Sequence, residues 1–207
     1  MAMRSRVGGL QLCNVEAVAI DQLSYHASER EARSGLPASC RRYDRNFGLI
    51  MATDDIRIRR AAPRDCDTIL HHRRSMFQEM NEGTEEELDR TVQIARPWLI
   101  SALSNGNYQG WLAEDGQGKV VAGAGVVILS WPASPKNPEN RRALIVNVYT
   151  EPEFRGRGLA RQLMLTVLDW LKEQGFGMAA LHASDAGRHL YETLGFRATN
   201  EMQMRLD

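Results

Sequence analysis

The 207-residue chain lacks several features that assign a protein quickly to a class. It contains no apolar run of about 18 residues, so no transmembrane helix is expected. Neither sign of charge dominates, because 26 lysines and arginines balance 26 aspartates and glutamates. This balance gives no indication of a nucleic-acid or membrane surface. No internal repeat is present.

Cysteine is scarce, and the three cysteines, Cys13, Cys40 and Cys66, show no metal-binding spacing. Their odd number and wide separation favour a reduced, cytoplasmic setting. The neighbouring His71 and His72 do not indicate a metal either, because adjacent positions on a helix face apart. We therefore expect no metal site.

The composition is that of a soluble globular protein with a sizeable core, with 43% hydrophobic and 25% charged residues. Residues 1–50 differ from the rest, since they are rich in arginine and show little periodicity. No secretory signal is expected there, because no suitable apolar segment follows the basic start. We interpret residues 1–50 as a flexible or dispensable extension and residues 51–207 as the domain. The alternative is an arm that binds a partner or a second copy.

Residues 143–164 contain the most informative pattern of the chain. A run of branched apolar residues leads through a polar turn to Arg155-Gly156-Arg157-Gly158, and apolar residues at helical spacing follow. This order predicts a buried strand, a glycine-rich turn and an amphipathic helix. The unpaired amides and the dipole at such a helix start favour an anion. The arginines at 155, 157 and 161 add positive charge around the turn.

Two phosphate-binding motifs do not fit this turn. A P-loop requires a lysine followed by a hydroxyl residue, and both are absent. A dinucleotide fingerprint requires a third glycine at position 161, which is Arg161 in this chain. It also requires an acidic residue about 20 residues on, but the next strand ends in Ser184-Asp185 only after a full helix.

The spacing of Arg155, Gly158 and Ala160 resembles the acetyl-CoA pyrophosphate loop of the GCN5-related N-acetyltransferase (GNAT) family. A second stretch, Ser184–Phe196, resembles the other signature of that family and lies at the expected distance. The resemblance covers about residues 56–206. It implies an α/β (α+β) fold with a mixed, splayed central sheet flanked by helices.

Periodicity and turn residues predict the elements of this fold, with a capping box at Thr84, Gly195 as the cap of the last helix, and a bulge or close packing at Gly123 and Gly125. Pro97 is expected to kink or split the second helix. The expected strands are 56–59, 110–114, 120–129, 143–150, 178–183 and 202–206, and the expected helices are 63–80, 84–103, 157–174 and 186–194.

The resemblance also implies how acetyl-CoA, a co-substrate, is held. The backbone near Val148 and Tyr149 would pair with the pantetheine arm, and the amides of Arg155–Ala160 would bind the pyrophosphate. The second motif departs from the family pattern at Ser184 and Gly187, which we still expect to contact the cofactor. The full predicted set is Val148, Tyr149, Arg155, Gly156, Arg157, Gly158, Leu159, Ala160, Arg161, Ser184 and Gly187.

Acyl transfer from a thioester to an amine by direct attack needs no protein nucleophile, and neither motif contains a cysteine. Tyr191 stands at the general-acid position that the resemblance implies, where it would protonate the departing sulfur. His182 is a candidate base because of its pKa range, and Asn147 is a candidate for orienting a water or the substrate. Glu79 and Glu82 lie in the region expected to form the acceptor pocket.

We therefore expect a cytoplasmic N-acetyltransferase that acts on a primary amine of a small molecule or peptide, and the family analogy is compatible with a homodimer. The main alternative is a catalytically silent acyl-CoA-binding regulatory module. A toxin-like acetyltransferase of aminoacyl-tRNA is disfavoured by the zero net charge. A nucleotide-binding α/β module is a more distant alternative.

Overall fold

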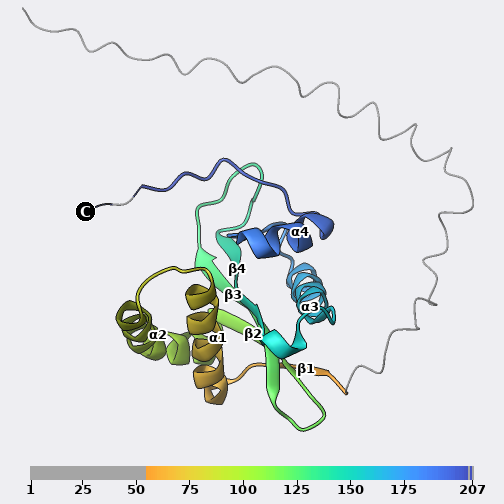
Figure 1. Cartoon of the computed structure of the whole chain (residues 1–207). Helices are drawn as coiled ribbons and strands as arrows, with labels where there is room; N and C mark the ends of the chain where they lie inside the picture. The colour runs from red at the N-terminus through yellow and green to blue at the C-terminus, as the bar shows by residue number, and fades with distance from the viewer. Residues whose placement is uncertain (1–54, 205, 207) are drawn as a thin grey trace, which may run out of the picture. The chain divides into compact units, whose positions relative to one another are not determined.

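The structure is a computed structural model, and it describes residues 55–204 and 206. The expectations for residues 1–50, and for Cys13 and Cys40 within them, lie outside these residues. The described part carries a five-stranded mixed sheet with helices on both faces, as the sequence predicts (Figure 1).

The strands lie in the sheet in chain order, β1-β2-β3-β4-β5. Every neighbouring pair is antiparallel except β4 and β5, which run parallel. That parallel pairing covers only three residues and ends at Ile145, so the two strands separate beyond it. The strands are β1 (Arg57–Arg60), β2 (Tyr108–Glu114), β3 (Val120–Ser130), β4 (Arg141–Thr150) and β5 (Ala179–Leu181).

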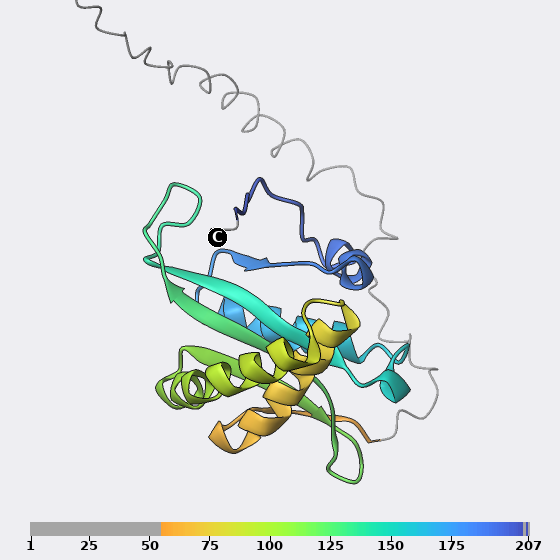
Figure 2. The same ribbon diagram turned by 60° about the vertical axis from the view of Figure 1, so that its left-hand side comes forward.

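Two pairs of helices cover opposite faces of the sheet (Figures 1 and 2). Helices α1 and α2 lie on one face, and α3 and α4 lie on the other. The helices are α1 (Cys66–Glu79), α2 (Glu85–Asn105), α3 (Leu159–Glu173) and α4 (Asp185–Thr193), with 3-10 turns η2 (Pro63–Asp65) and η3 (Pro152–Phe154).

Each face has its own apolar core. The α1–α2 side buries Cys66, Ile69, Leu70, Leu99, Ala102, Tyr108 and Leu112. The α3–α4 side is larger and includes Trp111, Val121, Val126, Ile145, Leu163, Met164, Val167 and Tyr191. Alternate residues of the strands supply the two cores, because successive side chains of a strand point to opposite faces.

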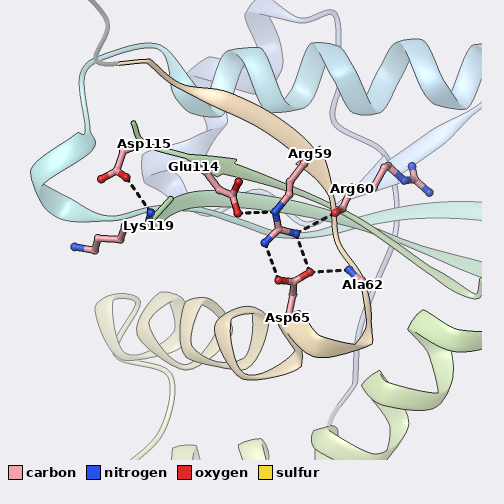
Figure 3. Close-up of polar contacts among 7 residues, drawn as sticks. All are labelled: Arg59, Arg60, Ala62, Asp65, Glu114, Asp115 and Lys119. Carbon is pink, nitrogen blue, oxygen red and sulfur yellow. Dashed lines mark hydrogen bonds and ion pairs between the residues drawn. The ribbon is translucent and has the colours of Figure 1, made fainter. Parts of the chain in front are cut away.

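A polar network fixes the first strand to the first helix, as Figure 3 shows. Arg59 on β1 donates two hydrogen bonds of 2.8 Å to Asp65 and one of 2.5 Å to Glu114 on β2. Asp65 also accepts from the amide of Ala62 at 2.8 Å. The Arg59 guanidinium holds the pKa of the Asp65 carboxyl below its usual range. Asp65 therefore stays ionised and positions the start of α1.

Several local predictions are confirmed and one is wrong. The capping box at Thr84 starts α2, and Gly195 ends α4 with a positive φ of 92°. Pro97 lies inside α2 without splitting it, since the helix continues to Asn105, and a kink there stays a prediction. The strand expected at 202–206 is not formed, since residues 202–204 belong to no strand and Met202 is 93% exposed. Alternation of apolar residues indicated that strand, but it does not supply a pairing partner.

Within residues 55–204 and 206, no helix is both long enough and apolar enough to cross a lipid bilayer.

Candidate functional site

An extra residue in β4 sets the geometry of the site. Gly125 on β3 pairs with Val146, but Gly123, two residues earlier, pairs with Tyr149, three residues later. The strand therefore bulges around Asn147, which has a positive φ of 55°. Asparagine adopts this left-handed conformation more readily than most residues.

The bulge turns two consecutive side chains toward α1 and α2. Val146 packs with the core of that side, and Asn147 follows it there. Val148 then packs in the core of the α3 side, and Tyr149 again faces α1, with its ring 5.1 Å from that of His72. The interruption thus places a polar side chain in a buried position of the sheet.

Asn147 joins a buried chain of hydrogen bonds. Its Nδ2 donates to the hydroxyl of Tyr108 at 3.1 Å, and its Oδ1 accepts from Nη1 of Arg73 on α1 at 2.9 Å. Burial raises the pKa of Tyr108 to about 12, so the phenol stays protonated. Gly125 makes room for it, because a Cβ there would lie 2.0 Å from the Tyr108 hydroxyl.

His72 lies beside the bulge with an unused nitrogen. Its side chain is 2% exposed, and its Nε2 has no hydrogen-bond partner among the described residues. Burial, with a smaller contribution from His71, lowers the pKa of His72 to about 4, although the Glu151 carboxylate lies 3.6 Å away. A small cavity lies between His72 and Asn147. It is lined by Ile69, His72, Tyr108, Gly110, Leu112, Gly123, Ala124 and Asn147.

The outer edge of β4 lacks a partner strand beyond the bulge. β5 pairs with β4 only as far as Ile145, so on that side the backbone of Val148 and Tyr149 pairs with no strand among residues 55–204. An extended ligand chain could hydrogen-bond there as an added strand does. The two residues predicted to contact pantetheine thus lie at an open edge.

The glycine-rich turn follows at the start of α3. Gly156 and Gly158 have φ of 75° and 79°, a region that L side chains rarely adopt, and a Cβ on either would meet no atom within 4 Å. No hydrogen bond to another backbone group of the described domain is made by the amides of Gly156, Gly158, Leu159, Ala160 and Arg161. The turn therefore presents a row of amides at a helix N-terminus, which suits an anion.

Arg155 is placed differently from the expectation. Its amide donates to the carbonyl of Pro152 at 3.3 Å, whereas the amides of Gly156 and Gly158 make no such backbone hydrogen bond within the described domain. Its guanidinium bonds both oxygens of Glu79, at 2.6 and 2.8 Å, and Tyr149 donates to the same carboxylate at 3.1 Å. Arg155 thus ties the turn to the end of α1 and does not add an unpaired charge to it.

The second motif builds the start of α4 around Tyr191. Ser184 caps the helix, and its hydroxyl accepts from the amide of Gly187 at 3.2 Å. A Cβ on Gly187 would lie 2.8 Å from the Tyr191 ring, so the small residue leaves room for that ring. Tyr191 is 8% exposed, and burial raises the pKa of its phenol. Arg161 joins the two helices by donating to Thr193 at 3.3 Å.

His182 does not join the other candidates. Its ring is exposed and lies 3.3 Å from Glu201, and no contact with Asn147 or Tyr191 is present among the described residues. Sequence reasoning also missed Tyr108, Arg73 and His72 as neighbours of the bulge. Gly123 and Gly125 on β3 were the available signal, because they indicated a bulge or close packing without identifying which side chains pack there.

Comparison with known proteins agrees with this geometry. Residues 68–196, more than half of the chain, match the family model described as Acetyltransferase (GNAT) family. Among curated proteins, the chain is 35% identical over 92 residues to a glucosamine 6-phosphate N-acetyltransferase of Trypanosoma brucei brucei, covering 44% of this chain and 58% of that protein. It is 30% identical over 94 residues to N-acetyltransferase 8B of Homo sapiens, covering 44% and 39%. The chain therefore matches less than two thirds of either relative.

Solved structures match over a larger share of their length. A GCN5-related N-acetyltransferase from Ralstonia eutropha is 32% identical with a TM-score of 0.69, covering 73% of this chain and 98% of that one. A predicted acetyltransferase from Clostridium acetobutylicum, solved with acetyl-CoA, is 25% identical with a TM-score of 0.65, covering 73% and 96%.

The buried His72 makes stability depend on pH. Because its pKa in the folded chain is about 4, below the ordinary 6.5, the unfolded chain binds this proton first as the pH falls. The contribution of neutral His72 to the free energy of unfolding is fully present above pH 6.5. It is lost between pH 6.5 and pH 4, which lowers that free energy by about 3 kcal/mol. Urea unfolding at pH 7 and pH 4.5 should therefore show a smaller acid-induced loss for His72→Gln than for the unsubstituted chain. The exposed His71→Gln serves as the control, and equal losses in all three proteins would contradict the prediction.

Proposed function

The chain belongs to the GNAT family of acetyltransferases, and we propose that it transfers the acetyl group of acetyl-CoA to a primary amine of a small molecule or peptide by direct attack. The observation that carries this proposal is the set of amides of Gly156, Gly158, Leu159, Ala160 and Arg161, which follow the unpaired edge of β4 in the chain. Together they form an anion site and an extended docking edge, which suit the pyrophosphate and the pantetheine arm of coenzyme A.

Each predicted residue then has a proposed task. The backbone of Val148 and Tyr149 would pair with pantetheine, and the amides of Gly156–Ala160 would bind the pyrophosphate. Arg157 and Arg161 add charge around the turn. Arg155, Ser184 and Gly187 act through structure: Arg155 fixes the turn to Glu79, Ser184 caps α4, and Gly187 gives the Tyr191 ring its place.

Tyr191 is our candidate for the acid that protonates the departing thiolate. Its raised pKa keeps the phenol protonated at neutral pH, as a proton donor requires. The attacking amine must lose a proton, since free alkylamines have a pKa of about 10. We propose that Asn147 orients the amine or a water for this step. His182 stays a prediction as the base, and its exposed position beside Glu201 supports it less than the bulge supports Asn147.

The decisive experiment is a screen for release of coenzyme A from acetyl-CoA across amino acids, polyamines, aminoglycosides, peptides and amino sugar phosphates. The last class is included because one relative is named a glucosamine 6-phosphate N-acetyltransferase. Binding of acetyl-CoA without turnover of any amine would favour the silent regulatory module instead. We further propose that residues 51–207 carry the activity, which deletion of residues 1–50 tests in the same assay. A homodimer stays a prediction.

The turn can be tested through its backbone conformation. Gly158→Ala places a side chain at a φ of 79°, which strains the turn and misdirects the amides. We expect calorimetry to show at least a roughly tenfold loss of acetyl-CoA affinity, the equivalent of about 1.4 kcal/mol. Gly118→Ala is a matched control, because Gly118 has a φ of 80° and open space around it in the β2–β3 hairpin. Equal affinity losses in both variants would refute a specific role for the turn.

The proposed acid can be tested by removing one atom. Tyr191→Phe keeps the ring that packs beside Phe196 and Gly187 but removes the proton. We expect the turnover number to fall about 100-fold, the usual contribution of a general acid, while acetyl-CoA affinity changes less than about twofold. Steady-state assays and calorimetry on the same preparation separate the two effects. Unchanged turnover would remove Tyr191 from the mechanism.

A further inference from the structure

Arg73 differs from the other partly buried arginines of the described domain. Arg59, Arg74, Arg141 and Arg142 each contact a carboxylate. Arg73 has no carboxylate of residues 55–204 within 4.0 Å of its guanidinium. Its positive charge is therefore not compensated by the part of the chain that the structure describes.

The surroundings of Arg73 are short of polar partners. Among the described residues its guanidinium makes one hydrogen bond, from Nη1 to the amide oxygen of Asn147. The ring of Phe77 lies 4.6 Å from the guanidinium carbon. Tyr108 beyond Asn147 is neutral. Two acidic groups of this face already have other partners: Glu79 bonds Arg155 and Tyr149, and Glu151 lies beside the two histidines. Burial without an anion lowers the pKa of Arg73.

A partly desolvated guanidinium without an anion is unfavourable, because burial removes hydration from the charge without supplying a compensating one. The arrangement is understandable if an anion reaches this position during the reaction. A guanidinium has five N–H donors in a planar fork and binds carboxylates and phosphates with two parallel hydrogen bonds. Only one donor of Arg73 is in use, and the side chain keeps some contact with solvent.

The position of Arg73 favours an anion other than the cofactor pyrophosphate. Arg73 lies six residues before Glu79 in α1, which is about 9 Å along the helix axis. Glu79 is the residue that bonds Arg155 at the entrance to the turn. Arg73 instead contacts Asn147, which lies at the bulge where we placed the amine.

Resting on the proposed function, we infer that the acceptor is an anionic amine, whose carboxylate or phosphate binds Arg73 while its amino group lies at the Asn147 bulge. Arg73 is then a specificity-determining residue. It selects acceptors that carry an acidic group a few bonds from the amine. Its guanidinium binds that group, and Asn147 lies in contact with both Arg73 and the amine. Amines without an acidic group, such as simple polyamines, lack this contact.

The test uses pairs of acceptors that differ only in the acidic group: ethanolamine phosphate against ethanolamine, and alanine against alaninamide. With the full chain and saturating acetyl-CoA, kcat/KM should be at least tenfold higher for the anionic member of one pair or both. Arg73→Gln should reduce that ratio by about 10- to 100-fold, the range expected for a hydrogen bond to a charged group. Arg73→Lys, which keeps the charge without the fork, should retain part of it.

Arg74→Gln is the matched control, because Arg74 is the next residue of the same helix and pairs with Glu85 and Asp89 on α2. It should leave the ratio unchanged. A purely structural Arg73 would lower kcat/KM for both members alike in Arg73→Gln, and that result, or equal use of both members by the unsubstituted chain, overturns the inference.

Failure of the proposed function is distinguishable from failure of this inference. If no amine releases coenzyme A, the function is wrong, and calorimetry of ethanolamine phosphate with the coenzyme A-saturated protein decides the role of Arg73. The inference then requires at least tenfold tighter binding to the unsubstituted chain than to Arg73→Gln. Equal binding, or no heat with either protein, overturns it.

Discussion

The single extra residue in β4 is the constraint from which the rest of the site follows. A regular strand would have sent Asn147 to the α3 core, where an amide would lack partners. The bulge instead places it against Tyr108 and Arg73, where each of its polar atoms is bonded. The cost is a left-handed conformation at a non-glycine residue. The neighbouring strand adapts to the bulge, since only a glycine at position 125 leaves room for the Tyr108 hydroxyl.

The open edge of β4 depends on the same region of the sheet. β5 follows β4 for three residues and then leads away to α4, which is held near α3 by the contact between Arg161 and Thr193. The backbone beyond the bulge is therefore unpaired on one side, and the turn at Gly156–Gly158 follows it in the chain after η3. The proposed anion site and the proposed docking edge are close in the chain because only a short connection separates β4 from α3.

The sequence predicted most elements in their order along the chain, the glycine turn and the helix caps, since each of these depends on local residues. Thr84 with Glu87, and Gly195 after α4, determine their helix ends through neighbours a few positions away. Gly123 and Gly125 indicated a bulge or close packing, but the residue that bulges could not be identified, because it depends on the register between β3 and β4. The neutral, buried His72 was equally hidden, since the pattern places two histidines on a helix without showing which one faces the sheet. Residues 202–204 carry the alternation of apolar residues that is typical of a strand, but they pair with no strand of the described domain.

Helix α1 has contacts at both halves of the site. Glu79 at its last position holds Arg155 and Tyr149, and Arg73 near its middle holds Asn147. A rigid helix moves as one body, so a shift that accommodates one substrate is transmitted to the other. Any such coupling is reciprocal by thermodynamic linkage: the factor by which the donor changes acceptor affinity equals the factor by which the acceptor changes donor affinity. Cooperativity between the two substrates within one chain is thus a property that this helix makes available to the fold.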